Sequence, residues 1–89
     1  MEYTGDQLKK IVSLGTLAYG VEKCLNILDI EDGAQFRVDF YDSESRVAKA
    51  YKKGRDIADF AIDTKLFDKA KAGDLPALKE FDKRKKMRE

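Results

Sequence analysis

Three short stretches decide the fold of this 89-residue chain: Ala-Tyr-Lys-Lys-Gly at 50–54, Ala-Asp-Phe-Ala-Ile-Asp at 58–63 and Ala-Gly-Asp-Leu-Pro-Ala-Leu at 72–78. The first two lie in a run without proline, from about residue 44 to 71, whose apolar residues recur at helical spacing. This pattern predicts one helix about 40 Å long at 1.5 Å per residue.

The third stretch predicts a helical hairpin. Gly73 suits the left-handed cap that ends a helix, and Asp74 suits the cap that begins the next one. Pro76 is tolerated there because the first turn of a helix has no acceptor for its missing N–H. We therefore expect a short final helix that folds Leu75, Leu78 and Phe81 back onto Leu66 and Phe67.

The first half of the chain carries the signals of three short helices. Thr4 and Gln7 form a capping-box pattern, and the helix that they begin should end between Gly15 and Gly20. A second helix is indicated by apolar spacing at Val21, Cys24, Leu25 and Leu28, followed by a turn over residues 29–33 in which Asp32 is a cap. Phe36, Val38 and Phe40 suggest a third helix, although residues 38–41 also alternate like a strand. Asp42 or Ser43 should then cap the long helix.

These signals together predict an all-α fold. It is a small bundle of about five helices with a helix-turn-helix-like N-terminal half, one long central helix and a short C-terminal helix. A chain of this length has room for one core, so residues 1–89 are expected to form a single domain. Residues 1–42 would be its helix-turn-helix-like part, and residues 43–89 the long helix with the hairpin.

The charge of the chain is unevenly distributed. Residues 1–48 hold five basic and nine acidic side chains, a balance of −4, and residues 49–89 hold thirteen and eight, a balance of +5, so the formal net charge is +1. This polarity favours head-to-tail contacts or the binding of a polyanion on one side.

Composition restricts the class of protein. With 43% hydrophobic and 39% charged residues, the chain is too apolar to be wholly disordered and too charged for a membrane. It holds no apolar run of the roughly 18 residues that cross a bilayer, and its start does not resemble a signal peptide. A cytoplasmic protein without a membrane partner is expected, and the single cysteine agrees with a reducing compartment.

Few residues could support catalysis. The chain has no histidine and one cysteine, which removes the common general base, the usual nucleophile pairs and the His/Cys zinc sites. Asp56, Asp59 and Asp63 share a helix face and could bind a divalent cation, but a solvated face with lysine partners is the favoured interpretation. Without a phosphate-binding loop motif either, the chain is expected to be no enzyme, with no catalytic residue, metal or cofactor.

Cys24 and the tyrosines are interpreted as parts of the core. Cys24 lies between Val21 and Leu28 on an apolar helix face, where a small buried hydrophobe is expected. Tyr3, Tyr19, Tyr41 and Tyr51 could stack on bases, but aromatic residues at helical spacing are more often buried.

DNA binding is expected of the positive half of the chain. Residues 19–30 are similar to the first helix and turn of a helix-turn-helix, although Leu25 stands at a position that prefers alanine and Asp29 at one that prefers glycine. The helix that would read bases, residues 32–42, has three acids against Arg37 and should be repelled by phosphates. The candidates for phosphate contact are therefore nine of the thirteen basic residues of the second half, on the long helix and in the tail: Lys49, Lys52, Lys53, Arg55, Lys83, Arg84, Lys85, Lys86 and Arg88.

Small residues recur along the long helix at three- or four-residue intervals. They allow another helix to approach closely, either from the same chain or from a second copy. The candidates for such an oligomer face are Ala50, Gly54, Ala58 and Ala61.

Residues 16–86 resemble the small helix-turn-helix proteins of the phage terminase small-subunit type, most specifically at residues 50–54, 72–74 and 77–78. The resemblance implies a phage or prophage protein in the cytoplasm of a bacterial host. It implies that the protein binds double-stranded DNA and forms a homo-oligomer beside a motor or packaging protein. The leading expectation is a non-enzymatic DNA-binding or DNA-packaging adaptor. The alternative is a helical interaction or oligomerisation module with no DNA role, and a carboxylate-dependent metal or nuclease function is less favoured.

Overall fold

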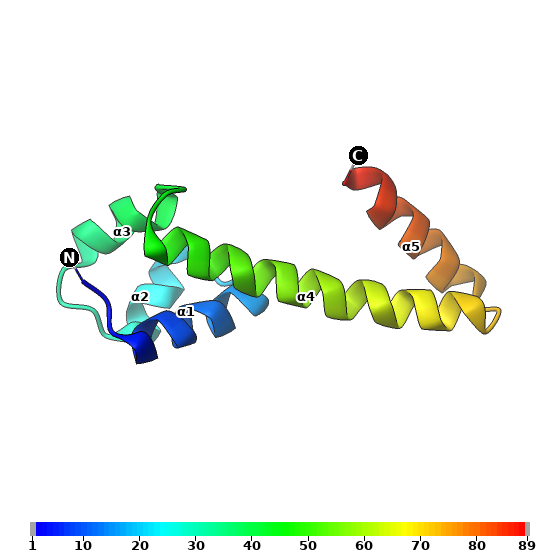
Figure 1. Cartoon of the computed structure of the whole chain (residues 1–89), viewed down its shortest axis with the longest axis horizontal. Helices are drawn as coiled ribbons and strands as arrows, with labels where there is room; N and C mark the ends of the chain where they lie inside the picture. The colour runs from blue at the N-terminus through cyan, green and yellow to red at the C-terminus, as the bar shows by residue number, and fades with distance from the viewer. Residues whose placement is uncertain (1, 89) are drawn as a thin grey trace. The chain divides into compact units, whose positions relative to one another are not determined.

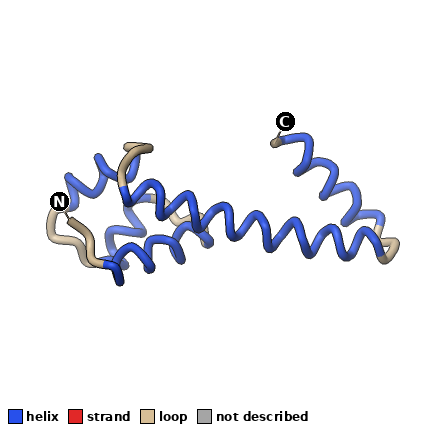
Figure 2. Tube along the Cα trace, viewed as in Figure 1, coloured by secondary structure: helices blue, strands red, loops and turns tan. Residues whose placement is uncertain are grey.

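Local caps set the helix boundaries in the computed structural model, which describes residues 2–88 (Figures 1 and 2). The helices are α1 (Gly5–Thr16), α2 (Val21–Leu28), α3 (Gly33–Tyr41), α4 (Arg46–Lys71) and α5 (Leu75–Met87), and residues 2–88 contain no strand. The all-α prediction with five helices is confirmed, and the strand alternative at 38–41 is wrong. Short turns join successive helices.

Three predicted caps are present. The Thr4 hydroxyl accepts from the Gln7 N–H at 3.0 Å while Gln7 accepts from the Thr4 N–H at 2.9 Å, which completes the capping box of α1. Asp32 accepts from the Gln35 N–H at the start of α3, and Asp74 accepts from the Ala77 N–H at the start of α5. Each of these bonds satisfies a backbone donor that the first helical turn leaves unpaired.

The predicted cap of α4 is wrong. Ser45, not Asp42 or Ser43, accepts a hydrogen bond from the Ala48 N–H at 3.0 Å, so α4 begins at Arg46. The same hydroxyl donates to the Asp39 carbonyl at the end of α3. Asp42 is the C-cap residue of α3, and its carboxylate accepts a hydrogen bond from the Glu44 N–H. Ser45 is the better cap because one hydroxyl serves the ends of both helices.

Contacts divide the chain into an N-terminal unit, Met1–Ala58, and a C-terminal unit, Asp59–Glu89. The boundary falls inside α4 and not at residue 42, where the sequence suggests a division. The reason is that the first half of α4 supplies Val47 and Gly54 to the packing of α1, α2 and α3.

The core of the N-terminal unit is apolar and aromatic. Phe36 and Val47 are fully buried, and the other buried members are Tyr3, Ile11, Leu14, Cys24 and Leu28. The Phe36 ring contacts Tyr3 and Phe40 at centroid distances of 6.3 and 6.1 Å, and Phe40 contacts Tyr51 at 4.9 Å. These rings fasten the N-terminal segment and α3 to α4, and the predicted burial of Cys24 is confirmed.

Two glycines allow α1 and α4 to lie in direct backbone contact (Figure 1). A Cβ atom on Gly15 would overlap the carbonyl of Tyr51, and one on Gly54 would lie 2.9 Å from the Thr16 nitrogen and closer still to the Val12 oxygen. No side chain fits at either position. The helix that approaches Gly54 is thus α1 of the same chain.

In the C-terminal unit, α5 turns back on the second half of α4. Gly73 adopts the predicted left-handed conformation with φ of 98°. Phe81 contacts Phe67 at 5.5 Å between ring centroids, as predicted, but Leu75 and Leu78 are exposed and that part of the prediction is wrong. Residues 77, 81, 84 and 88 share the face of α5 that meets α4, and positions 75 and 78 lie roughly 160° and 100° away around the helix.

Candidate nucleic-acid interface

The predicted phosphate contacts on α4 are partly neutralised by acids of the same chain. Lys49 lies 3.9 Å from Glu44, and Lys52 lies 3.1 Å from Asp56 one helical turn away. Lys53 is exposed, whereas Arg55 is half-buried. Exposed pairs of this kind contribute little to stability and are screened by salt, so phosphate can compete for these lysines.

The predicted contacts on α5 fall into two groups. Lys83, Lys85 and Lys86 are exposed, and no ion pair is formed by these three among residues 2–88. Arg84 and Arg88 instead bind carboxylates of α4. The two groups differ because residues 84 and 88 share the inner face of α5 and the three lysines do not.

Asp59, Asp63, Arg84 and Arg88 form an arginine clamp between the two helices of the C-terminal unit. Arg84 Nε lies 2.6 Å from Asp63 Oδ1, and an Arg84 Nη lies 3.2 Å from Asp59 Oδ1. Arg88 also donates to Asp63. The hydrogen bond from Arg84 is the main reason that the pKa of Asp63 is lowered from its ordinary 3.8, and the same bond raises the pKa of Arg84. The clamp is the chief polar attachment of α5 to α4.

The clamp predicts a loosening of α5 in acid. Because the pKa of Asp63 is lowered, its contribution is complete well above pH 3.8 and is lost as the pH falls through 3.8 towards the lowered value. We expect the amide signals of α5 to move towards their unpacked positions over that range in a two-dimensional NMR titration. Asp63→Asn should cause the same displacement at neutral pH, and Asp68→Asn, an exposed position on the same helix, should not. Identical spectra of the two variants at neutral pH would refute this role.

The three carboxylates considered as a cation site on α4 are paired with cations of the same chain. Asp63 is shared by two arginines, Asp59 binds Arg84, and Asp56 binds Lys52. Among residues 2–88, no group of three or more His, Cys, Asp or Glu residues could hold a metal ion. These carboxylates therefore act as partners of cations of the same chain.

The turn between α2 and α3 accommodates both departures from the helix-turn-helix pattern. Asp29 adopts the left-handed conformation, with φ of 53° and ψ of 51°, for which the motif normally uses glycine. Leu25, at the position that prefers alanine, faces Gly33, where a Cβ atom would lie 3.7 Å from both of its methyl groups. These are ordinary van der Waals distances, so Leu25 packs beside the start of α3 without a clash.

The acids of α3 are not all directed outward. Asp39 accepts from the Tyr3 hydroxyl at 2.6 Å and from the Gln35 amide at 2.9 Å, and these bonds lower its pKa. Arg37 forms a two-bond pair with Glu22 of α2, at 2.8 and 2.9 Å. The outer face of α3 therefore offers the bases of DNA no uncommitted cation.

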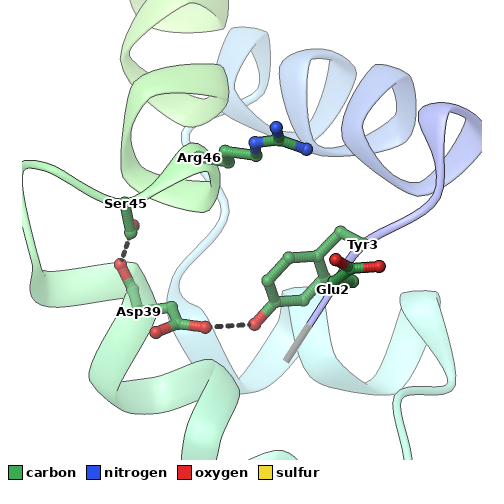
Figure 3. A pocket seen from close by; sticks show the side chains of 5 residues that line it. All are labelled: Glu2, Tyr3, Asp39, Ser45 and Arg46. Atoms are coloured by element: carbon green, nitrogen blue, oxygen red, sulfur yellow. Dashed lines mark hydrogen bonds between the residues drawn. The ribbon is translucent and has the colours of Figure 1, made fainter.

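A surface pocket of about 330 Å³ lies beside this network, lined by Glu2, Tyr3, Asp39, Ser45 and Arg46 (Figure 3). The Tyr3 and Ser45 hydroxyls both donate to Asp39, one to its carboxylate and the other to its backbone carbonyl. Burial and the bond to Asp39 raise the pKa of Tyr3 above its ordinary range. The phenol therefore stays protonated and donates to Asp39, and this hydrogen bond attaches the N-terminal segment to α3.

The other tyrosines follow the prediction with one exception. Tyr51 donates to the Tyr19 carbonyl at 2.8 Å, and Cys24 donates weakly to the same oxygen at 3.6 Å. This carbonyl lies in the break between α1 and α2, so the two bonds stabilise the break. Tyr41 is 75% exposed, which departs from the expected burial.

The predicted oligomer face is divided along α4. Gly54 is buried against α1, Ala50 and Ala58 are half-buried, and Ala61 is exposed. Gly54 is therefore not accessible to a second copy. At Gly54 the missing side chain allows the close approach of α1, and spacing alone could not tell which helix would approach.

The sequence interpretation missed the arginine clamp, although a signal for it exists. Asp59 and Asp63 are four residues apart, as are Arg84 and Arg88, and a predicted turn joins the two helices. Residues four apart share a helix face, so the pairs are spaced to match across a hairpin.

Comparisons with protein-family models, with curated proteins and with solved structures gave no match. None of the helices within residues 2–88 is both long and apolar enough to cross a membrane.

Proposed function

We propose that this chain is a non-enzymatic adaptor that binds double-stranded DNA through phosphate contacts of its basic half. The observation that supports this function best is the exposed lysine cluster at Lys83, Lys85 and Lys86 on α5. Because the clamp pairs Arg84 and Arg88 with Asp59 and Asp63, those two acids do not offset the lysines. Lys53 on α4 is a further exposed cation.

Contacts of this kind position a protein on DNA without reading its sequence. Arg37, the single cation of α3, is held by Glu22, and we assign no base-reading residue to that helix. The expected binding is therefore salt-dependent and tolerant of sequence.

Removing two adjacent lysines tests the proposal. The double variant Lys85→Gln, Lys86→Gln should weaken binding to a labelled duplex about tenfold at low salt and reduce the slope of log K against log salt by about 2. Fluorescence anisotropy at several salt concentrations measures both quantities. The matched control is Lys9→Gln, Lys10→Gln, another exposed Lys-Lys pair, on α1. Equal losses in the two double variants, or no binding of the unaltered protein even at low salt, would contradict the proposal.

The resemblance to phage terminase small subunits extends the proposal to a packaging role in a bacterial cytoplasm, beside a motor protein. Its support is the helix order and the stretches at 50–54 and 72–78, and the structure adds the accommodated turn at Asp29. Co-purification of the tagged chain with a nucleic-acid motor from infected cells is the corresponding test.

A second candidate function is association with other chains, with or without DNA. It is favoured by large apolar side chains that lie outside the core in both units, among them Val38, Tyr41, Phe60 and Leu75. Ala77 is the only buried side chain among the described residues of the C-terminal unit. A helical unit of about 30 residues with so little buried apolar surface gains stability from a partner.

A further inference from the structure

The outer face of α3 carries an exposed apolar stripe in the N-terminal unit. Ala34, Val38 and Tyr41 follow one another at i, i+4 and i+7, and Val38 and Tyr41 are 62% and 75% exposed. Asp32 and Asp42 lie at the two ends of the helix and are exposed. We call this surface the acidic face: a short apolar stripe with a carboxylate at each end.

The C-terminal unit carries another exposed apolar surface, and lysines lie beside it. Phe60 and Phe67 lie seven residues apart on α4, and both are exposed, Phe60 by 62%. The Phe67–Phe81 contact continues this surface onto α5, where Leu78 lies one turn before Phe81 and is also exposed. Lys71 lies over the Phe67 ring at 5.3 Å, and Lys85 follows Leu78 by two helical turns. We call this surface the basic face.

The two faces match in length and in charge. Ten residues separate Asp32 from Asp42, and ten separate Leu75, which follows the turn after Lys71, from Lys85. At 1.5 Å per residue, both spans are about 15 Å. A short helix with an acid at each end therefore matches an apolar surface of similar length with Lys71 and Lys85 near its ends, and amphipathic helices bind apolar surfaces through such a stripe.

We infer that the occupant of the basic face is α3 of a second copy of this chain. The inference rests on the second candidate function, association, and does not require DNA binding. Both complementary faces occur on one sequence, whose halves carry −4 and +5. A symmetric pairing of two basic faces would bring lysines together, whereas a head-to-tail pairing brings each lysine end to an acid end.

This association has defined physical properties. The contact is heterologous, so successive copies form a closed ring or an open filament. A helix of nine residues covers less than the roughly 800 Å² per partner of a stable interface, so each contact is weak and has a dissociation constant in the micromolar range or above. Salt weakens it further because the charges at the ends are exposed.

Complementation between two variants tests the inference. Val38→Arg places a cation in the acidic face, and Phe60→Asp places an acid in the basic face. Both positions are exposed, so each variant should fold. By sedimentation velocity over a concentration series, each variant alone should associate at least tenfold more weakly than the unaltered chain. Leu17→Arg, which changes another exposed apolar residue outside both faces, should associate normally.

An equimolar mixture of the two variants is the decisive measurement. Val38→Arg retains an intact basic face and Phe60→Asp an intact acidic face, so one contact forms and growth stops at a 1:1 complex. Association of both single variants at wild-type strength would overturn this interface while leaving the second candidate function intact. A wild-type chain that is monomeric at every concentration would overturn both. Weakened single variants that do not complement each other would show a symmetric contact and overturn the head-to-tail arrangement.

Discussion

Replacing Gly54 with alanine is expected to lower the free energy of unfolding of the N-terminal unit by about 2 kcal/mol, since overpacking against backbone atoms falls at the upper end of the usual cost, about 3 kcal/mol. The added Cβ would lie 2.9 Å from the Thr16 nitrogen and closer to the Val12 oxygen, and both are backbone atoms of α1. Backbone atoms cannot rotate away, so the two helices must separate. Alanine in a helix interior normally gains about 1 kcal/mol over glycine, which offsets only part of this cost.

The matched control for this variant is Gly5→Ala. A Cβ on Gly5 meets nothing within 4 Å at the start of α1, so this substitution should leave stability unchanged or raise it by up to about 1 kcal/mol. Urea unfolding followed by circular dichroism at the helix band gives both values. Equal stability of the two variants would show that α1 and α4 are not in contact at Gly54.

The parts of the fold that depend on neighbouring residues could be predicted from the sequence. The caps at Thr4, Asp32 and Asp74 and the left-handed Gly73 each satisfy a local backbone requirement, and all four are present. The cap of α4 was missed because Asp42, Ser43 and Ser45 are all suitable residue types. The choice of Ser45 depends on the position of α3, which propensity does not contain.

Parts of the fold that depend on distant residues could be predicted only as possibilities. Small residues at 50, 54 and 58 indicate a close helix approach, but only the folded structure shows that Gly15 of α1 supplies the partner. Likewise, the rotation of α5 about its own axis places Arg84 and Arg88 against α4 and leaves Leu75 and Leu78 exposed. A shift of one residue turns a helix by about 100°, so a small uncertainty in register exchanges buried and exposed positions.

The sequence predicts which basic residues the candidate site contains, but it does not predict which of them are paired with acids of the same chain. Lys83, Lys85 and Lys86 are exposed, whereas Arg84 lies within the same basic run and belongs to the clamp. A basic run therefore overstates the charge available to a polyanion by the number of its residues that face acids of the same chain. The same holds for α3, where the sequence predicts that Asp39 repels DNA, whereas its carboxylate accepts hydrogen bonds from Tyr3 and Gln35.

Replacing Phe36 with alanine should cost the N-terminal unit about 3–5 kcal/mol, because truncation of a buried phenylalanine loses transfer free energy and leaves a cavity. Phe36 is 0% exposed, and its ring contacts those of Tyr3 and Phe40. The cavity left by the truncation would therefore be lined by apolar groups, which do not stabilise a water molecule inside it.

The matched control is Phe60→Ala, which removes the same atoms from a side chain that is 62% exposed. That change should alter stability by less than about 0.5 kcal/mol, as surface substitutions usually do. Urea unfolding at a protein concentration low enough to prevent association separates the two effects. A loss of less than about 1 kcal/mol for Phe36→Ala would mean that α3 does not pack through this ring, since truncation of a fully buried aromatic costs several times more. In that case the orientation of α3, and with it the outward placement of Val38 and Tyr41, would have to be rejected.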